Sequence, residues 1–572
     1  MYKTVIQSES MFTIKKIAKF KLMLLVGTQI STLAYQSVSA QTVTITDKNE
    51  TNISTSTADS GSPANVVVAD GGEISVESGV ALTVDSNNTI SNSGLINNTG
   101  SSNVTGVLFE TSAGPNLIST FNFDTTIAVG DSSPTVSGGS DNYGILIDGS
   151  GTFQGNIIAT EQSGTSANGD NSAAFSLKAG MIGNIDIGTA AVVGTNSNAV
   201  EILGDLTGDL NILTNATARQ AGNQGLYIDG NITGGVSNVG FIASGTPAGF
   251  DQNFNEVAAI ASIASVRISG NVTGGFANDI IFQDSNQNIV NVNEGDDTSA
   301  FTINTSSIEA LAGGYAVLIT PEKDDKPTWT NISLGNTNSF YGDYSIMNQG
   351  AIAARGINTG QEVTTIFITG ATQGNTNYST TLDFGIYNGL FGSIQAESLD
   401  ANATGLHIGN GATVPEFVNN GSLSIDATVS TDINGDATGD GGDGFGIVID
   451  AGGSLARFEN NNSFAVSAAG PNSSAYGILD HSGTLNQFRN SGSILTLLSE
   501  GSTGKAVAVD LSNNISGVNF FNEGNIFGDI YLGSGNSTIA LDGLTVAEAA
   551  ALSAVAAERA IDGTIFLSGG SS

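Results

Sequence analysis

The chain has 572 residues, and its 53 Asp and Glu against 16 Lys and Arg give a formal net charge of −37. A chain this acidic repels nucleic acid, acidic lipid head groups and other polyanions, so none of these is an expected partner. The chain contains no Cys, which excludes disulfides, thiolate metal sites, a Cys nucleophile and a lipid-modified N-terminal Cys.

The first forty residues are arranged like a secretory signal. Lysines gather in residues 1–21, Leu22–Ala34 is a mostly apolar run, and Tyr35–Ala40 is small and polar. This order is typical of an export signal that is removed after translocation. A membrane anchor is the alternative, but the apolar run falls short of the roughly 20 residues that span a bilayer. We therefore predict that residues 1–40 are a signal peptide cleaved before Gln41.

Short stretches downstream of the signal alternate apolar residues with small or polar ones. Three of them are Gly144–Asp148, Gly225–Asp229 and Gly446–Asp450. Period-two alternation that ends at a turn residue predicts short β-strands. High net charge favours disorder, but hydrophobic residues make up 39% of the chain and recur too regularly for a disordered segment.

Two motifs recur along the chain. The segment Asp229–Asn238 returns forty residues later as Ser269–Asn278. A second motif, with Phe followed by Asn-x-Gly-x-apolar, begins at Phe417 and returns after 41, 30 and 32 residues. Repeats with periods of this size indicate a solenoid. The copies of the second motif, two of which keep only its Asn-x-Gly-x-apolar core, are Phe417–Leu423, Phe458–Phe464, Phe488–Ile494, Phe520–Ile526, Asn92–Ile96 and Asn348–Ile352.

The second motif has a structural interpretation. Its Phe and the apolar residue six positions later are expected to point into a core, and its Asn and Gly to adopt the left-handed turn conformation. Stacked Asn amides can then hydrogen-bond to the next coil. We predict an all-β fold, a right-handed parallel β-helix, with roughly 20 to 25 residues per coil. At roughly 4.8 Å per coil, its length would be on the order of 100 Å.

The pattern also predicts domain limits after the signal. Residues 41–70 are expected to be an N-terminal cap or flexible lead, residues 71–543 the β-helix, and residues 544–572 a short helix and a terminal rung. The helix is expected over the Ala-rich segment Val546–Ile561, where it would cover the last open edge. The densest charge run, Pro321–Trp329, is expected to project as a loop.

With its signal, coils and Asn-x-Gly-x-Ile turns, the chain resembles the passenger domain of bacterial autotransporters, the type V secretion proteins. The resemblance implies a Gram-negative bacterium, outer-membrane translocation machinery as a partner, and secretion or cell-surface display with ligands on host or neighbouring cells. Family members end in a translocator β-barrel, whereas this chain ends at Gly569–Ser572 without amphipathic barrel strands. We therefore expect no direct membrane insertion by this chain, and outer-membrane association only if a barrel is supplied.

A serine protease is one enzyme class that the resemblance brings to mind. Gly130–Pro134 resembles the nucleophile motif of protease passengers, but Ser133 replaces the Gly that shapes an oxyanion hole. The only two histidines, His407 and His481, lie downstream of this motif, where a protease of that fold needs one upstream. Neither His has a second His or Cys nearby, so a zinc site is not expected.

A secreted β-helix enzyme that cleaves polysaccharide, as a glycosidase or lyase, is the alternative functional hypothesis. Asp205 and Asp209, and the trio Glu294, Asp296 and Asp297, are candidates for the acid and base of a glycosidase. Such pairs also arise by chance in a chain so rich in acids. A lyase would need Lys or Arg to hold a uronate, and the basic residues are few and scattered.

Calcium is a further candidate ligand. Asp432–Asp436 and Gly439–Gly444 place several carboxylates in a Gly-rich stretch, and calcium accepts oxygen ligands with loose geometry. This stretch departs from the calcium-loop signature, and Gly533–Thr538 has Asn and Ser where calcium-binding nonapeptides have Asp. A solvated acidic loop is the simpler interpretation. We expect no catalytic, cofactor-binding or metal-ligating residues, and an exported scaffold or adhesin-like passenger without catalytic activity.

The attachment of the mature chain can be tested. The apolar runs Val257–Val266 and Leu544–Ala557 have 10 and 14 residues, too few to span a bilayer. If residues 1–572 are the whole gene product, cell fractionation should recover the chain from periplasm or medium, or release it from cells with salt or chelator. Recovery only with detergent-extracted outer membrane would contradict this expectation.

Overall fold

The computed structural model describes most of the chain that follows the predicted signal. The described residues are 41–114, 116–130, 139–246, 249–250, 256–257, 259–283, 289–290, 302–324, 328–337, 342–431, 438–541, 544–545, 561–562 and 564–567. The fold lies in the unit that runs from Thr42 to Ser572. The predicted signal peptide, residues 1–40, lies outside the described residues.

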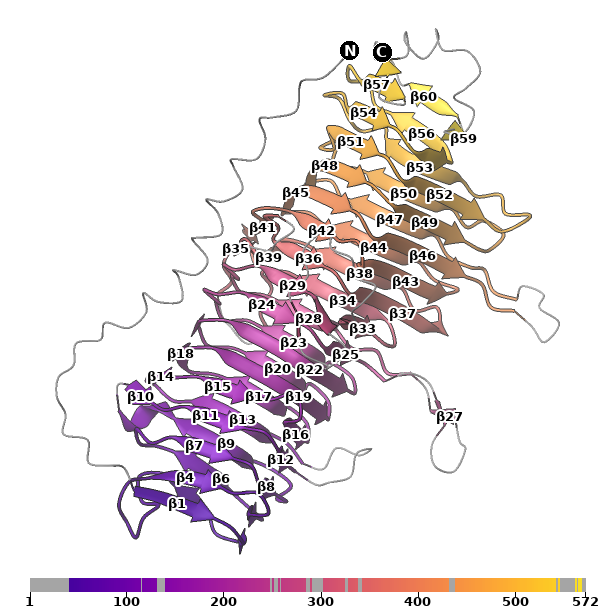
Figure 1. The fold of residues 1–572 in the computed structure, drawn as a ribbon. Coiled ribbons are helices and arrows are strands. Elements are labelled where there is room, and N and C mark those ends of the chain that lie inside the picture. The colour runs from indigo at the N-terminus through magenta and orange to yellow at the C-terminus, as the bar shows by residue number, and fades with distance from the viewer. Residues whose placement is uncertain are drawn as a thin grey trace, which may run out of the picture. The chain divides into compact units, whose positions relative to one another are not determined.

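Parallel β-strands stacked coil upon coil form this unit (Figure 1). Successive coils contribute strands to a 16-stranded sheet, which we call sheet B, and to a 33-stranded sheet, which we call sheet A. Sheet A has two rows of strands, and the long strands β19 (Ile185–Val193) and β22 (Leu210–Arg219) belong to both rows. The parallel β-helix predicted from the repeats is confirmed.

Each sheet can be followed along the chain by its strands. Sheet B contains β3 (Ile53–Ser54), β6 (Val80–Val84), β9 (Thr105–Glu110), β13 (Tyr143–Asp148), β17 (Ala173–Leu177), β20 (Asn198–Ile202), β23 (Gln224–Ile228), β28 (Ala264–Ile268), β34 (Gly314–Ile319), β38 (Val363–Ile368), β44 (Ala403–Ile408), β47 (Gly444–Ile449), β50 (Ala475–Asp480), β53 (Ala506–Leu511), β56 (Asp529–Leu532) and β60 (Ile565–Leu567). The first row of sheet A contains β1 (Gln41–Ile45), β4 (Ala64–Val68), β7 (Ile90–Asn92), β11 (Phe121–Phe123), β15 (Ile157–Ala159), β19, β22, β24 (Val236–Asn238), β29 (Phe276–Asn278), β36 (Ile346–Asn348), β42 (Ile386–Asn388), β45 (Ala412–Asn419), β48 (Ser454–Asn460), β51 (Gln487–Asn490), β54 (Asn519–Asn522) and β57 (Thr538–Leu541). The second row contains β2 (Lys48–Asn49), β5 (Glu73–Val76), β8 (Leu95–Asn98), β12 (Thr126–Val129), β16 (Gly164–Asn168), β19, β22, β25 (Phe241–Ser244), β33 (Ser307–Ala310), β37 (Ala351–Thr359), β43 (Ser393–Leu399), β46 (Ser422–Thr428), β49 (Ser463–Ala468), β52 (Ser493–Leu498), β55 (Asn525–Phe527) and β59 (Ile561–Asp562).

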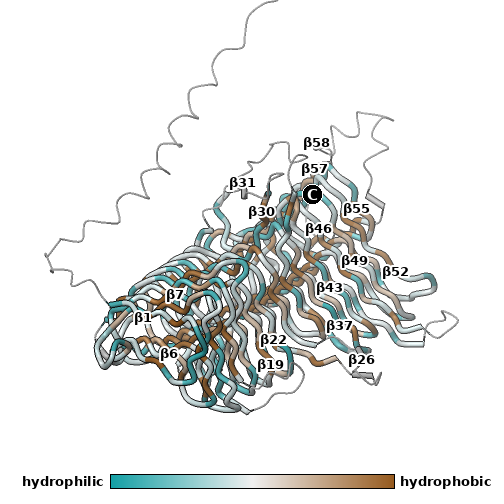
Figure 2. Tube along the Cα trace, turned by 60° about the horizontal axis from the view of Figure 1, so that its bottom comes forward, coloured by the Kyte–Doolittle hydropathy of each residue, from teal (hydrophilic) through white to brown (hydrophobic). Residues whose placement is uncertain are grey.

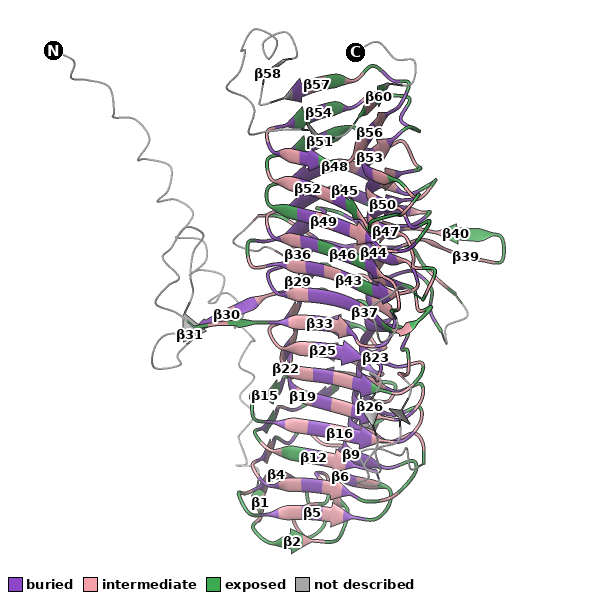
Figure 3. Cartoon of the chain, turned by 90° about the vertical axis from the view of Figure 1, so that its right-hand side faces the viewer, coloured by how far each residue is buried: buried purple, intermediate pink, exposed green. Residues whose placement is uncertain are grey.

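Shorter strands occupy the turns and the edges. Sheet A also takes in β35 (Ile332–Leu334), β41 (Thr380–Leu382) and β58 (Leu544–Thr545), and a four-stranded sheet is formed by β10 (Asn116–Ile118), β14 (Thr152–Gln154), β18 (Gly180–Ile182) and β21 (Leu206–Thr207). Among the described strands, β57 pairs with β58 antiparallel, and further antiparallel hairpins leave the coils, some of them visible in Figure 3. They are β26 (Gly249–Phe250) with β27 (Glu256–Val257), β30 (Ile280–Gln283) with β31 (Ile289–Val290) and β32 (Thr302–Thr305), and β39 (Ala371–Gln373) with β40 (Thr376–Tyr378).

The coils are longer than predicted. Phe175 and Val200 are neighbours in sheet B and lie 25 residues apart in sequence, but Val266 and Val317 lie 51 apart. Loops and hairpins inserted at the turns account for the difference. The 16 strands of sheet B, spaced roughly 4.8 Å apart, span roughly 70 Å, which is of the predicted order.

A first coil lies within residues 41–70, the range predicted to be a cap or flexible lead. Its strands β2 and β3 pair with β5 and β6 of the following coil. The helix predicted over Val546–Ile561 lies outside the described residues, except for Ile561, which begins strand β59. Among the described residues, the only helical turn is the 3-10 turn η2 (Thr111–Ala113).

Apolar side chains form continuous columns inside the coil. Hydrophobic and hydrophilic stretches alternate along the chain (Figure 2), and buried positions recur along the strands (Figure 3). In one column, ring centroids of successive coils are 5.8, 5.8 and 4.2 Å apart. Both motif positions predicted to point into the core are confirmed as buried. These residues are Phe417, Phe458, Phe488 and Phe520 in the first row and Leu423, Phe464, Ile494 and Ile526 in the second.

A ladder of buried asparagines runs beside the Phe column. Each ladder Asn ends a first-row strand, and the Nδ2 of every one but the last, Asn522, donates to the Oδ1 of the Asn in the next coil at 2.7 or 2.8 Å. The side chains are at most 4% exposed. A buried amide costs free energy unless it is hydrogen-bonded, and here the neighbouring coil supplies the partner. The ladder residues are Asn238, Asn278, Asn348, Asn388, Asn419, Asn460, Asn490 and Asn522.

Asn92 shows what the same position is like without a ladder. It is fully buried in β7, and the register places Val68 on one side of it and Phe123 on the other. Its Nδ2 has no hydrogen-bond partner among the described residues. The motif core Asn92–Ile96 is therefore an isolated copy, because neither adjacent coil offers an amide.

The motif glycines play a different role from the one predicted. Neither the Asn nor the Gly of this motif adopts the left-handed conformation, since none has a positive φ. The glycines instead lie against the backbone of the previous coil, so that a Cβ on Gly524 would stand 1.9 Å from the carbonyl oxygen of Gly492. Asn462 takes this position in one coil and donates to the carbonyl of Asn420 at 3.1 Å. Close packing of coils, rather than turn conformation, favours Gly here.

Substitution in the ladder should be costly. Asn419→Ala removes the acceptor of Asn388 and the donor to Asn460 while both stay buried, so we expect a loss of about 1–3 kcal/mol in the free energy of unfolding. Urea unfolding followed by circular dichroism measures it. Asn92→Val is the matched control, because the Nδ2 that it removes already lacks a partner and the bond that it gives up is the one from the Gly94 N–H to Oδ1 at 3.3 Å, so it should lower the free energy of unfolding less than Asn419→Ala does. Equal destabilisation by both variants would contradict the ladder argument.

Candidate functional site

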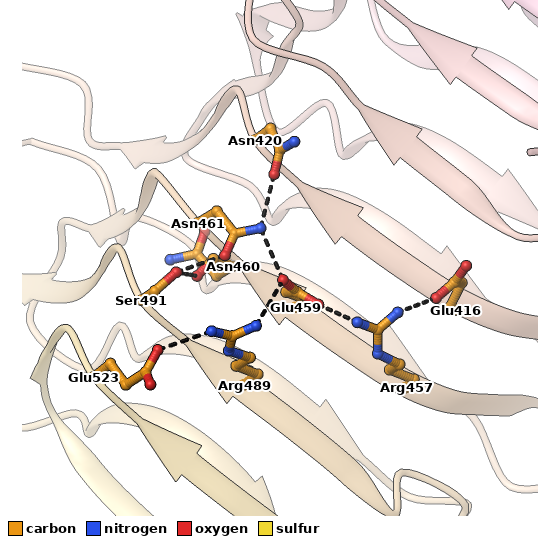
Figure 4. A network of polar contacts seen from close by, with 9 residues as sticks. All are labelled: Glu416, Asn420, Arg457, Glu459, Asn460, Asn461, Arg489, Ser491 and Glu523. Atoms are coloured by element: carbon orange, nitrogen blue, oxygen red, sulfur yellow. Dashed lines mark hydrogen bonds and ion pairs between the residues drawn. The ribbon is translucent and has the colours of Figure 1, made fainter. Parts of the chain in front are cut away.

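A row of alternating charges lies on the outer face of sheet A, across β45, β48 and β51 (Figure 4). Arg457 pairs with both Glu416 and Glu459. Arg489 lies 3.6 Å from Glu459 and 2.9 Å from Glu523. Each guanidinium therefore lies between two carboxylates. We call these five residues the charged row.

Amides and hydroxyls extend the charged row along the sheet. The Nδ2 of Asn461 donates to Glu459 at 3.0 Å and to Asn420 at 2.8 Å, and its Oδ1 accepts from Ser491 at 2.5 Å. Asn420 donates to the hydroxyl of Tyr387 at 3.0 Å. One polar network thus reaches from β42 to the turn after β54, which fixes the geometry of this face.

An apolar patch borders the charged row. Met347, Tyr387 and Val418 precede Glu459 in the same outward column. Tyr344 stacks on Tyr387, with ring centroids 4.9 Å apart. Burial and, after it, the Glu416 carboxylate raise the pKa of Tyr344 to about 12, so this phenol stays protonated and cannot serve as a base. Met347, Tyr387 and Val418 are only 2–6% exposed, so this patch is packed beside the charged row and is not open to a partner.

Sequence reasoning missed the charged row, although a signal for it was present. The second motif aligns Glu459 with Arg489 as the residue that follows Phe. The prediction considered only the inward Phe of the motif and not the outward residue that follows it. Opposite charges at one outward position of successive coils predict ion pairs between the coils.

The described part of the charged segment Pro321–Trp329 lies on sheet B and does not project as predicted. Lys323 Nζ lies 2.6 Å from Asp229 Oδ1, and the two side chains are only 8% and 5% exposed. Arg267, in β28, pairs with Asp324 at 2.6 Å. The prediction of a projecting loop was wrong because the buried partners of these charges belong to earlier coils, Asp229 directly after β23 and Arg267 in β28.

Residues 321–324 fold back over Tyr227, and we call this segment the strap. The Arg267 guanidinium lies over the Tyr227 ring, 5.2 Å from its centroid. Burial and, after it, the Asp229 carboxylate raise the pKa of Tyr227. The indole of Trp329 donates to the carbonyl of Lys323 at 3.2 Å. The strap is therefore a packed part of the outer face of sheet B.

The glycosidase candidates Asp205 and Asp209 serve the coil geometry. Asp205 Oδ1 accepts from the backbone N–H of Asn231 at 2.9 Å, and Asp209 Oδ1 accepts from the backbone N–H of Gly235 at 2.9 Å. One coil later, Asn231 Oδ1 accepts from the backbone N–H of Asn271 at 3.2 Å. Each carboxylate thus hydrogen-bonds the turn of the following coil. These hydrogen bonds indicate that Asp205 and Asp209 stabilise turns.

A second polar ladder stands where the chain enters sheet B. The backbone N–H of Asn142 donates to Ser172 Oγ at 3.0 Å, that of Ser172 to Ser197 Oγ at 3.1 Å, and that of Ser197 to Asn223 Oδ1 at 2.9 Å. All four side chains are at most 2% exposed. Polar side chains at this corner therefore also form hydrogen bonds from one coil to the next.

The two histidines lie apart from any such constellation. His407, on the outer face of sheet B, has Nε2 2.9 Å from Asp450 Oδ2, and its ring stacks on Phe367 at 4.7 Å. His481 follows β50 at a turn. Among the described residues, no group of three or more His, Cys, Asp or Glu is placed to hold a metal ion.

The calcium candidates are described in part. Asp443 Oδ1 accepts from the backbone N–H of Ser474 at 2.7 Å, and Ser537 Oγ accepts from the backbone N–H of Val518 at 3.2 Å. Both contacts join one coil to another. The remaining sequence candidates lie outside the described residues, and they are Ser132 and Ser133 of the protease-like motif, Glu294, Asp296, Asp297 and residues 432–437 of the acidic stretch.

Comparison with known proteins adds no family assignment. No protein-family model matches the chain, and no curated protein matches its sequence. Within the part of the chain that the structure describes, no helix has the length and apolar character needed to cross a membrane.

The strap gives a direct test of the buried ion pair. Lys323→Met removes the ammonium beside buried Asp229, so we expect the free energy of unfolding to fall by about 3–5 kcal/mol. Arg355→Met is the control, because the Arg355–Glu397 pair has side chains 37% and 54% exposed and should contribute less than about 1 kcal/mol. Urea unfolding compares the two variants. A loss for Lys323→Met as small as that of the control would contradict the assignment.

Proposed function

We propose that this chain is an exported β-helix of the autotransporter passenger type, which works without catalysis as a cell-surface scaffold or adhesin-like protein. The observation that carries the proposal is the use of polar side chains between coils. The asparagine ladder, the Asp205 and Asp209 turns and the Asn142 ladder all hydrogen-bond one coil to the next. Such bonds build a stack whose outer faces are presented to partners.

Export is part of the same proposal. The basic, apolar and small-residue order of residues 1–40 supports passage through the inner membrane. The absence of Cys from the sequence suits an oxidising compartment, where a free thiol would be reactive. We place the mature chain in the medium or at the surface of a Gram-negative cell, reached with the help of outer-membrane translocation machinery.

Binding and cleavage assays with the purified mature chain test this function. We expect saturable binding to host or bacterial cells, and no release of reducing ends or unsaturated uronates from neutral or acidic polysaccharides. Heat-unfolded protein is the control for non-specific adsorption. Release of either product would overturn the scaffold proposal in favour of the glycosidase or lyase hypothesis.

A further inference from the structure

Apolar side chains occupy outward positions of sheet B along its second half. Register places Leu318, Phe367, His407, Val448 and Leu479 next to one another in one outward column. Leu318 and Val448 are 7% and 9% exposed, and the other three, which include His407, are half-buried. A largely apolar column on an outer sheet face is a candidate interaction surface. The rings of this face, which we call the aromatic strip, are Tyr315, Phe367, His407, Phe445, Tyr476 and Tyr531.

The rings of the aromatic strip form three separate stacks along the coil, which are Tyr315 with Phe367 and His407, Phe445 with Tyr476, and Tyr531 with Phe566. Centroids are 5.3 Å apart for Tyr315 and Phe367 and 5.5 Å apart for Phe445 and Tyr476. Tyr531 stacks at 4.5 Å on Phe566, whose side chain is 42% exposed. Because the ring faces cover each other, the ring edges are what the strip offers to a partner. Such a surface suits aliphatic groups laid across it.

Carboxylates border the aromatic strip. Asp450 pairs with His407 at 2.9 Å. Burial and, after it, the Glu362 carboxylate raise the pKa of Tyr315. Burial raises the pKa of Tyr476, the Ser474 hydrogen bond opposes this shift, and the carboxylates of Asp443 and Asp510 add to it.

More charges stand around the last coils of the strip. Burial and the carboxylates of Asp529 and Asp510 raise the pKa of Tyr531. One lysine, Lys505, stands at the start of β53 on the same edge as Asp443, with Ser474 between them in the stack. The strip is therefore an apolar surface with a mainly negative rim.

We propose that the aromatic strip is the adhesive face of this protein and that it binds a basic, amphipathic polypeptide segment in an extended conformation. Lys and Arg have apolar stems that can lie across ring edges and charged heads that can reach carboxylates at the rim. Complementary charge steers such a segment to the acidic chain and suppresses acidic competitors. The inference rests on the proposed function, because it names the surface and the partner class of the adhesion.

Peptide binding to the full mature chain tests the proposal. Fluorescence anisotropy should show a peptide of alternating Lys and Leu binding at least about tenfold more tightly than one of alternating Glu and Leu, with affinity falling as salt rises. Equal affinity for the two peptides would overturn the proposal. So would binding of neutral polysaccharide or anionic lipid vesicles in preference to the Lys–Leu peptide.

Variants locate the binding surface. The double variant Phe367→Ser/Tyr476→Ser should weaken Lys–Leu peptide binding about tenfold, because it removes ring edges from two parts of the strip. The control Phe521→Ser changes a 41% exposed Phe on sheet A and should weaken binding less than about twofold. Similar losses in the two variants would overturn the assignment to sheet B.

A charge variant keeps the test independent of ring packing. Asp510→Asn keeps the acceptor that the backbone N–H of Ser512 uses at 3.0 Å, so the fold should persist. We expect binding about twofold to fivefold weaker and less sensitive to salt, since one rim charge is lost. An unchanged affinity and salt dependence would count against the carboxylate rim.

Cell adhesion separates failure of this inference from failure of the proposed function. Both Phe367→Ser/Tyr476→Ser and the unmodified chain should be compared on the same cells. If the two adhere equally, the strip is not the adhesive face and the scaffold function stands. If the unmodified chain does not adhere, or if it cleaves polysaccharide, the proposed function itself fails.

Discussion

The hydrogen bond from one buried asparagine amide to the next is the interaction on which the other features depend. A buried amide that loses its partner is costly, so a coil shifted by one residue would leave Asn419 or Asn460 unpaired. The ladder thereby fixes the register of each coil on its neighbour. Register in turn sets the outer face, because Val418 and Glu459 precede these two asparagines and are aligned by them. The inner ladder and the charged row are consequences of one alignment.

The sequence predicted the features that depend on local repetition. Strands such as Gly446–Asp450 and core positions such as Phe458 follow from alternation and spacing within a single coil. What it could not predict depends on contacts between distant coils. Lys323 reaches Asp229 across 94 residues, and no local pattern identifies that partner. Position 524 favours Gly because the backbone of Gly492 in the previous coil lies against it. The left-handed turn conformation predicted for this Gly was the wrong explanation.

Two outer faces of the coil carry ion pairs, one buried and one exposed to solvent. At the strap, the Lys323 and Asp229 side chains are almost fully buried, and so is Tyr227. In the charged row, Arg457 and Arg489 are 39% and 48% exposed, so salt screens their attraction to glutamates more strongly. In the sequence, the candidate sites appear only as scattered Asp and Glu residues. The charge of a residue does not reveal which carboxylate forms an ion pair with a Lys or Arg in the folded chain. The structure shows which acids face a cation, as Asp229 and Glu459 do, and which border the aromatic strip.

The asparagine ladder forms regardless of how many residues separate its members in sequence. Asn278 and Asn348 are 70 residues apart and Asn460 and Asn490 only 30, yet both pairs meet at 2.7 Å. The longer interval contains the hairpin of β30 and β32 and the strap, and the stack continues past both. Each gap between ladder residues is thus a natural grafting position. Foreign loops can be exchanged there by recombination or by design, and the coil supplies the same two attachment points whatever it carries.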